Sequence, residues 1–190
     1  MSDHELFNKN LSFFSPAFRE KLLAFSNASH YDFSVETSKN NYPVPKYRNK
    51  YLHSKYDPLI EAQRFSEQTT GNYSQLVIFG FAFGYHVEEL LNKFPTAKIV
   101  VIEFTPVLFV EALKRRDFSK LLKTGRVEFI VEEELNSFLE QFKALDNQIK
   151  NESGCHVVIY PPSMDSVSVE FKKVIDALQL IEMGRRQPRV

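Results

Sequence analysis

The sequence predicts an α/β fold, namely a Rossmann-like three-layer domain with a mostly parallel sheet, preceded by a small subdomain of one helix and a β-hairpin. Two short apolar runs, Leu76–Phe79 and Ile99–Ile102, have the composition of parallel strands that are buried on both faces. A glycine turn and a helical pattern lie between them, and strand and helix patterns alternate through the rest of the chain. Since such alternation is typical of a parallel sheet, we expect the carboxyl ends of the strands to share one edge.

The N-terminal part is predicted to hold a helix and a hairpin. Ser15 is a suitable N-cap and Pro16 suits the first helical position. Residues 31–53 alternate apolar and polar side chains around a pair of asparagines, which predicts a β-hairpin. Because Pro43 and Pro45 cannot donate to a ladder, we expect their strand to be an edge strand.

A second helix signal links the hairpin to the main sheet. Asp57 is a good N-cap and Pro58 follows it at the first helical position. We therefore expect a boundary here, with residues 1–56 as the helix and hairpin subdomain and residues 57–190 as a Rossmann-like, methyltransferase-like domain.

The glycine turn carries the main candidate site. Gly80, Ala82 and Gly84 have the spacing of small residues that lets a Rossmann-like turn bend tightly and lets a ligand approach the next helix. Glu103 ends the following strand about 20 residues later, where such folds place an acid that accepts hydrogen bonds from ribose hydroxyls. The spacing predicts a nucleoside-type ligand, and tight packing of strand against helix is the alternative explanation.

The residues around this turn narrow the choice of ligand. Phe81 and Phe83 are bulky, and Glu88 and Glu89 fall in the first turns of the helix, where they would oppose a bound phosphate. A diphosphate is therefore disfavoured, and a pocket for adenosylmethionine is easier to fit. Ile78 weakens that alternative, since methyltransferases usually carry an acid at this position.

Three further side chains, those of His53, His86 and Tyr160, are candidates for binding a ligand at the same edge of the sheet. His86 lies in the first turn of its helix, where the dipole disfavours the charged form, so it suits either a neutral hydrogen-bonding imidazole or simple packing against Tyr160. His53 belongs to a polar cluster that could lie over the mouth of the glycine turn, and its alternative role is to satisfy a backbone carbonyl. We interpret residues 132–134, three consecutive glutamates, as a solvated helix start and expect no metal site.

The remaining elements follow from apolar periodicity. We expect strands at 126–131 and 156–160, and helices at 106–115, 135–149 and 167–181. Cys155 and His156 are adjacent on a strand, so they point to opposite faces and are poorly placed as a nucleophile and base. No familiar zinc, nucleophile-elbow or phosphate-loop motif is present, so no catalytic residue is assigned.

Composition describes an ordinary globular chain. The 190 residues include 24 basic and 24 acidic side chains, so no global charge attracts nucleic acid or an anionic membrane. A single cysteine excludes an internal disulfide and fits a reducing compartment. With no signal peptide and no apolar run of about 20 residues, we expect a cytoplasmic protein with neither membrane nor nucleic acid as a partner.

Two stretches carry a resemblance to a known family. The segment Leu52–Pro58, followed by Glu61-Ala62 and Arg64, and the segment Phe79–His86 with the downstream Val101-Ile102-Glu103, resemble the N-terminal domain of motility accessory factor (Maf) proteins over roughly residues 35–162. The family resembles glycosyltransferases that attach nonulosonic acids to flagellin serines and threonines, and its central domain is related to archaeal 6-hydroxymethylpterin diphosphokinase.

What the resemblance implies is limited by its extent. The chain resembles only the leading domain, as a stand-alone protein or a fragment, so no catalytic residue of the family is carried over. The residues carried over are Gly80, Gly84, His86, Glu103 and the segment His53–Asp57. The resemblance implies an accessory module that binds a nucleotide-type ligand or a partner, the partner being a Maf-type catalytic domain or flagellin. The alternative is a small adenosylmethionine-dependent methyltransferase.

Overall fold

The buried apolar runs form one parallel sheet, as predicted. The computed structural model, which describes residues 2–27, 32–151, 154–165 and 167–186, gives the strand order β6-β5-β4-β7. The strands are β4 (Gln75–Phe79), β5 (Lys98–Glu103), β6 (Val127–Val131) and β7 (Cys155–Ile159). All three strand pairs are parallel, so the α/β, Rossmann-like prediction is confirmed.

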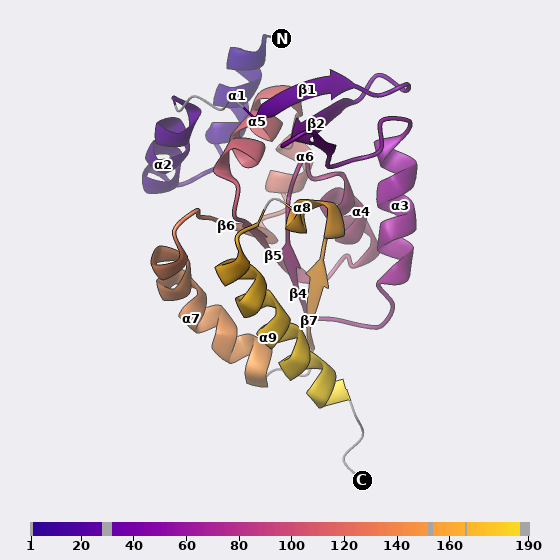
Figure 1. Ribbon diagram of the computed structural model, residues 1–190, viewed down its shortest axis with the longest axis vertical. Coiled ribbons are helices and arrows are strands. Elements are labelled where there is room, and N and C mark those ends of the chain that lie inside the picture. The colour runs from indigo at the N-terminus through magenta and orange to yellow at the C-terminus, as the bar shows by residue number, and fades with distance from the viewer. Residues whose placement is uncertain (1, 28–31, 152–153, 166, 187–190) are drawn as a thin grey trace.

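Helices cover both faces of this sheet (Figure 1). After the strands come α4 (Tyr85–Lys93), α5 (Pro106–Arg115), α7 (Leu135–Asn151) and α9 (Val169–Arg186). The other helices are α1 (Asp3–Leu11), α2 (Pro16–Ser26), α3 (Pro58–Gln68), and the short α6 (Ser119–Leu122) and α8 (Pro161–Met164). The helix α1 was not predicted, although Ser2 and Glu5 form a capping box at its start.

Successive residues of the central strand supply the two halves of the core. Leu76 and Ile78 pack on the side of α1, α2, α4 and α5, whereas Val77 and Phe79 pack on the side of α7 and α9. Because adjacent strand residues point to opposite faces, an unbroken apolar run is what a sheet covered on both sides requires.

The predicted helix caps are present. The Ser15 hydroxyl accepts a hydrogen bond from the Phe18 N–H at 3.3 Å, and Pro16 is the first residue of α2. One carboxylate oxygen of Asp57 accepts hydrogen bonds from the first N–H groups of α3. These local interactions satisfy donors that a helix start leaves unpaired.

The N-terminal part forms a second, antiparallel sheet with the order β1-β2-β3. Its strands are β1 (Phe33–Thr37), β2 (Pro43–Tyr47) and β3 (Lys50–Tyr51). Tyr31, where the predicted hairpin began, lies outside the described residues. Figure 1 shows this small sheet beyond the carboxyl ends of the parallel strands, so it covers the edge where a ligand crevice was expected.

The prediction of an edge strand at the two prolines was wrong, because β2 lies between β1 and β3. The prolines are tolerated since β3 has only two residues and pairs with Lys46 and Tyr47, beyond both prolines. Pro45 therefore needs no N–H on the side that faces β3. Its carbonyl accepts a hydrogen bond from the Leu52 N–H at 3.0 Å.

The helices of the N-terminal part also contribute to the main core. Phe7, Leu11 and Leu22 belong to the same buried cluster as Leu76 and Ile78. The boundary between residues 56 and 57 stays a prediction. Within the described residues, none of the helices has the length and apolar character that crossing a bilayer requires.

Candidate functional site

The glycine turn between β4 and α4 needs both of its glycines. Gly80 has φ +95° and Gly84 has φ +73°, in the left-handed region that residues with a Cβ avoid. A Cβ on Gly80 would lie 2.5 Å from the Cβ of Ser163, and one on Gly84 would lie 2.6 Å from the ring of Phe81. Ala82, with φ +47°, adopts the left-handed conformation despite its Cβ, so something must hold it there.

Glu103 is the group that holds the turn. One oxygen of its carboxylate accepts hydrogen bonds from the Phe81 N–H at 2.8 Å and the Ala82 N–H at 3.0 Å. The other oxygen accepts from the Thr105 N–H at 2.9 Å. The residue is only 1% exposed, and this burial raises the pKa of its carboxyl, an effect that the N–H donors oppose.

His53 reaches the same turn from the loop after β3. Its Nε2 accepts a hydrogen bond from the Phe83 N–H at 3.1 Å, so the proton of the neutral ring lies on Nδ1. Nδ1 is 2.8 Å from the hydroxyl of Tyr160 and 3.3 Å from a carboxylate oxygen of Glu61. Burial lowers the pKa of His53, which agrees with a geometry that protonation of Nε2 would break.

His86 and Tyr160 form a stacked pair beneath His53. Their rings are 3.8 Å apart and almost parallel, at 8°. His86 Nε2 lies 2.8 Å from the carbonyl of Gly80, to which it donates, and burial lowers the pKa of this imidazole well below its usual value. The Tyr160 hydroxyl donates to the carbonyl of Leu52 at 2.8 Å. The stack therefore joins the parallel sheet to the small sheet.

Arg116 completes this cluster, and sequence reasoning missed it. Its guanidinium donates to the carbonyl of Phe83 and to the carboxylate of Glu88, and lies 3.7 Å from the ring centroid of Tyr85. The Tyr85 hydroxyl in turn donates to the carbonyl of Pro43 at 2.8 Å. Since Arg116 follows the end of α5 with no local motif, only the packing of α5 beside α4 could have identified it.

The structure thus brings seven of the predicted site residues into one buried cluster, which we call the turn cluster, whereas Lys55 and Tyr56 of the segment His53–Asp57 are exposed. Its predicted members are Gly80, Ala82, Gly84, His86, Glu103, His53 and Tyr160. Most of the polar atoms that were expected to bind a ligand form hydrogen bonds within the protein itself. His86 Nδ1 is an exception, because it has no hydrogen-bond partner among the described residues. Binding of a nucleoside at this cluster stays a prediction.

The acidic run after β6 follows its prediction in part, since Glu133 and Glu134 are exposed directly before α7, but Glu132 differs. Glu132 is buried rather than solvated, and its carboxylate lies 2.6 Å from the ammonium of Lys21 on α2. Gln141 of α7 donates to the same oxygen at 3.1 Å. Glu132 was misread because α2, far away in the sequence, supplies the cation that makes burial of this carboxylate tolerable. Across the described part of the chain, no group of three His, Cys, Asp or Glu side chains is arranged to hold a metal ion.

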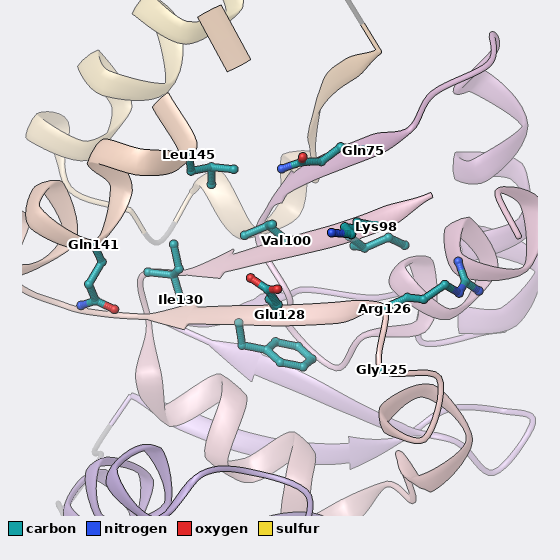
Figure 2. A pocket seen from close by; sticks show the side chains of 11 residues that line it. Gln75, Lys98, Val100, Gly125, Arg126, Glu128, Ile130, Gln141 and Leu145 are labelled. Atoms are coloured by element: carbon teal, nitrogen blue, oxygen red, sulfur yellow. The ribbon is translucent and has the colours of Figure 1, made fainter. Parts of the chain in front are cut away.

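A hollow of about 530 Å³ extends from the starts of the strands along β5 and β6 as far as Ile130 (Figure 2). Three of its lining residues, Gln75, Lys98 and Arg126, lie where β4, β5 and β6 begin. Leu145 of α7 lines the same hollow. The guanidinium of Arg126 donates to the carbonyls of Leu91, Phe94 and Ala97, which places it as a cap on the end of α4. This hollow is separate from the turn cluster.

Comparison with known proteins identifies one family. The family model described as the glycosyltransferase Maf N-terminal domain matches residues 5–178. No curated protein matches the sequence. Among solved structures, a Maf glycosyltransferase from Magnetospirillum magneticum AMB-1 is similar, with a TM-score of 0.65 and 15% identity. The similarity covers 94% of this chain but 35% of that one, so the chain spans about a third of that enzyme and shares its fold over this length.

Proposed function

Because the chain belongs to the family of Maf glycosyltransferase N-terminal domains, we propose that it is a non-catalytic accessory domain, which acts by binding the catalytic part of a protein glycosyltransferase. The reaction served would be transfer of a nonulosonic acid to flagellin in the cytoplasm. The observation that carries the proposal is the turn cluster, since the polar groups at the usual ligand edge of the sheet are engaged with one another.

The chemistry of the cluster supports a structural role. A nucleophile or general base has to reach a substrate, but His53, His86 and Glu103 are all buried. Glu103 uses one oxygen to hold the glycine turn and the other to hold the Thr105 N–H after its own strand, and His53 uses Nε2 to hold Phe83. These residues fix the glycine turn against the small sheet and give the domain a rigid shape for recognition by another protein region.

The first test is a transfer assay. We expect the chain alone to transfer no sugar from an activated nonulosonic acid to flagellin, because no acid, base or nucleophile set faces solvent in the turn cluster. Incorporation of labelled sugar is measured by mass spectrometry with the chain alone, with a Maf catalytic region alone, and with both. Sugar incorporation by the chain alone, above a control without protein, would refute the accessory role.

The second test concerns the nucleoside-type ligand that the glycine spacing predicts. If the turn binds a nucleoside, calorimetric titration with cytidine monophosphate, adenosylmethionine or adenosylhomocysteine should detect it at millimolar concentration. Gly84→Val should then abolish binding, although its strain calls for a folding check, since the added Cβ would meet Phe81. We expect no binding, because the acceptors of Glu103 are already used. Selective binding of adenosylmethionine would instead favour the methyltransferase alternative, which the family match does not support.

A further inference from the structure

The outward face of α9 carries three apolar side chains that the domain itself does not cover. Val169, Leu180 and Met183 are 62%, 69% and 64% exposed. With 3.6 residues per turn and a rise of 1.5 Å per residue, they lie within about 60° of one another around the helix axis and span about 21 Å along it. Lys173 and Asp176 lie on the same side of α9 between Val169 and Leu180, so the contiguous part is the pair Leu180 and Met183, and such neighbouring exposed apolar side chains suggest a contact surface where single ones do not. We call these three residues the α9 stripe.

The opposite face of α9 is already buried. Phe171, Ile175 and Leu178 pack in the core on the α7 side of the sheet. α9 therefore buries one apolar face in the domain and exposes the apolar pair Leu180 and Met183 on another side. The rest of the domain covers only the inner side of α9.

A hollow of about 420 Å³ lies between α9 and the end of β7. Ile159, Pro161 and Met164, from the end of β7 and from α8, form one wall, and Lys172, Asp176 and Gln179 of α9 form the other. The strand order places β7 at an edge of the sheet. An apolar centre with a rim of charged and amide groups is the usual composition of a protein interface.

The kind of occupant follows from the family. The domain in this family is the N-terminal part of a transferase, and the matched region makes up 35% of the similar Maf glycosyltransferase. In such an enzyme the remaining polypeptide follows the C-terminal side of the domain, and α9 is the helix that leads to that side. Leu180 and Met183, the two most exposed members of the stripe, lie in the C-terminal half of α9.

We propose that the α9 stripe and the hollow beside β7 form the surface on which the catalytic part of a Maf-type glycosyltransferase docks. This inference rests on the proposed function and gives it a location. The partner would present apolar side chains to the stripe and fill the hollow with at least one of them. Lys172 and Asp176 would pair with polar groups at the rim.

The test is a binding measurement between the 190-residue chain and the catalytic region of the Maf glycosyltransferase from the same organism. The double variant Leu180→Glu/Met183→Lys places opposite charges one helical turn apart, leaves the net charge unchanged and alters only exposed positions. We expect it to weaken binding about thirtyfold or more, as loss of central interface residues does. Thermal unfolding should show that the variant folds like the wild type.

A matched control separates this surface from exposed apolar residues in general. Ile60 and Leu23 are 47% and 45% exposed on α3 and α2, so Ile60→Glu/Leu23→Lys makes the same chemical change away from α9. We expect this control to bind the catalytic region as the wild type does. Equal weakening by both double variants would overturn the assignment to α9.

A labelling measurement gives a second, independent readout. The native cysteine, Cys155, is buried, so Met183→Cys introduces one readily accessible thiol for maleimide. We expect the catalytic region to slow its labelling about tenfold or more if it covers the stripe. A thiol on Leu23, introduced as Leu23→Cys, should react at the same rate with and without the catalytic region.

The outcomes distinguish the inference from the function on which it rests. If the wild type does not bind the catalytic region, the proposed function itself fails. If the wild type binds and the α9 double variant binds equally well, the function stands but the location is wrong. If the wild type alone forms a dimer that the α9 variant abolishes, a second copy covers the stripe, and this too overturns the inference.

Discussion

Glu103→Gln should lower the free energy of unfolding by about 2–4 kcal/mol. The two carboxylate oxygens accept hydrogen bonds from the N–H groups of Phe81, Ala82 and Thr105. In glutamine one oxygen becomes an NH₂ group, which is a donor and would face backbone donors. At least one buried N–H then has no acceptor, and the left-handed conformation of Ala82 loses its restraint. Urea denaturation followed by circular dichroism measures the change.

The matched control is Glu128→Gln on the neighbouring strand β6. Glu128 is exposed, so removing its charge should change stability by no more than about 0.5 kcal/mol. Equal stability of the Glu103 variant and the wild type would show that the carboxylate is not needed to hold the turn. In that case it would be available to ribose hydroxyls, as the sequence spacing suggests.

The parts of the fold that the sequence predicts are those set by short-range signals. Leu76–Phe79 is apolar at every position because both faces of β4 are covered, and this pattern can be read without any knowledge of the partners. Asp57-Pro58 predicts the start of α3 because capping involves groups within one turn of each other. The parallel sheet follows from the alternation of these elements.

The parts that could not be predicted depend on residues far apart in the chain. Lys21 neutralises Glu132 although the two side chains lie on α2 and after β6. The two-residue strand β3 has no sequence pattern of its own, yet its presence moves β2 from the edge to the middle of the small sheet. Such pairings appear only when the tertiary contacts are known.

The candidate site shows the same division. The sequence correctly predicts that the ends of β4, β5 and β7 converge, because parallel strands end at one edge. It does not tell a carboxylate that binds a ligand from one that binds the neighbouring glycine turn, since both must stand at the end of β5. Glu103 accepts from Phe81 and Ala82, and that information lies in the conformation of the turn rather than in its spacing.

Acid should destabilise the protein through His53 and His86. Burial lowers the pKa of both imidazoles in the folded state, whereas in the unfolded chain they titrate near about 6.5. As the pH falls below about 6.5, the unfolded state binds protons that the folded state does not, so the free energy of unfolding decreases. Two such histidines together give a loss of up to about 2.7 kcal/mol between about pH 7.5 and 5.5.

Neighbouring charged groups modify this pH dependence of stability, but burial of the two histidines remains its main cause. Glu61 favours the charged form of His53, and Arg116 disfavours it in both histidines. Glu103 acts in the opposite direction, because its raised pKa lets the folded state hold a proton at pH values above about 4.5, where the unfolded carboxyl has lost it. The contribution of each histidine is therefore best measured as the difference between a variant and the wild type.

His86→Phe isolates one of the two histidines. Phenylalanine keeps a ring against Tyr160 but cannot take up a proton, so the loss of stability between about pH 7.5 and 5.5 should shrink by up to about 1.4 kcal/mol. The variant also loses the hydrogen bond to the Gly80 carbonyl, which lowers stability by about 1 kcal/mol at every pH and leaves the slope of stability against pH unaffected.

Urea denaturation at several pH values measures the slope, with the exposed His4→Gln as a control that should keep the wild-type dependence. A slope that is the same in His86→Phe and the wild type would show that His86 titrates alike in the folded and unfolded states, contrary to its burial.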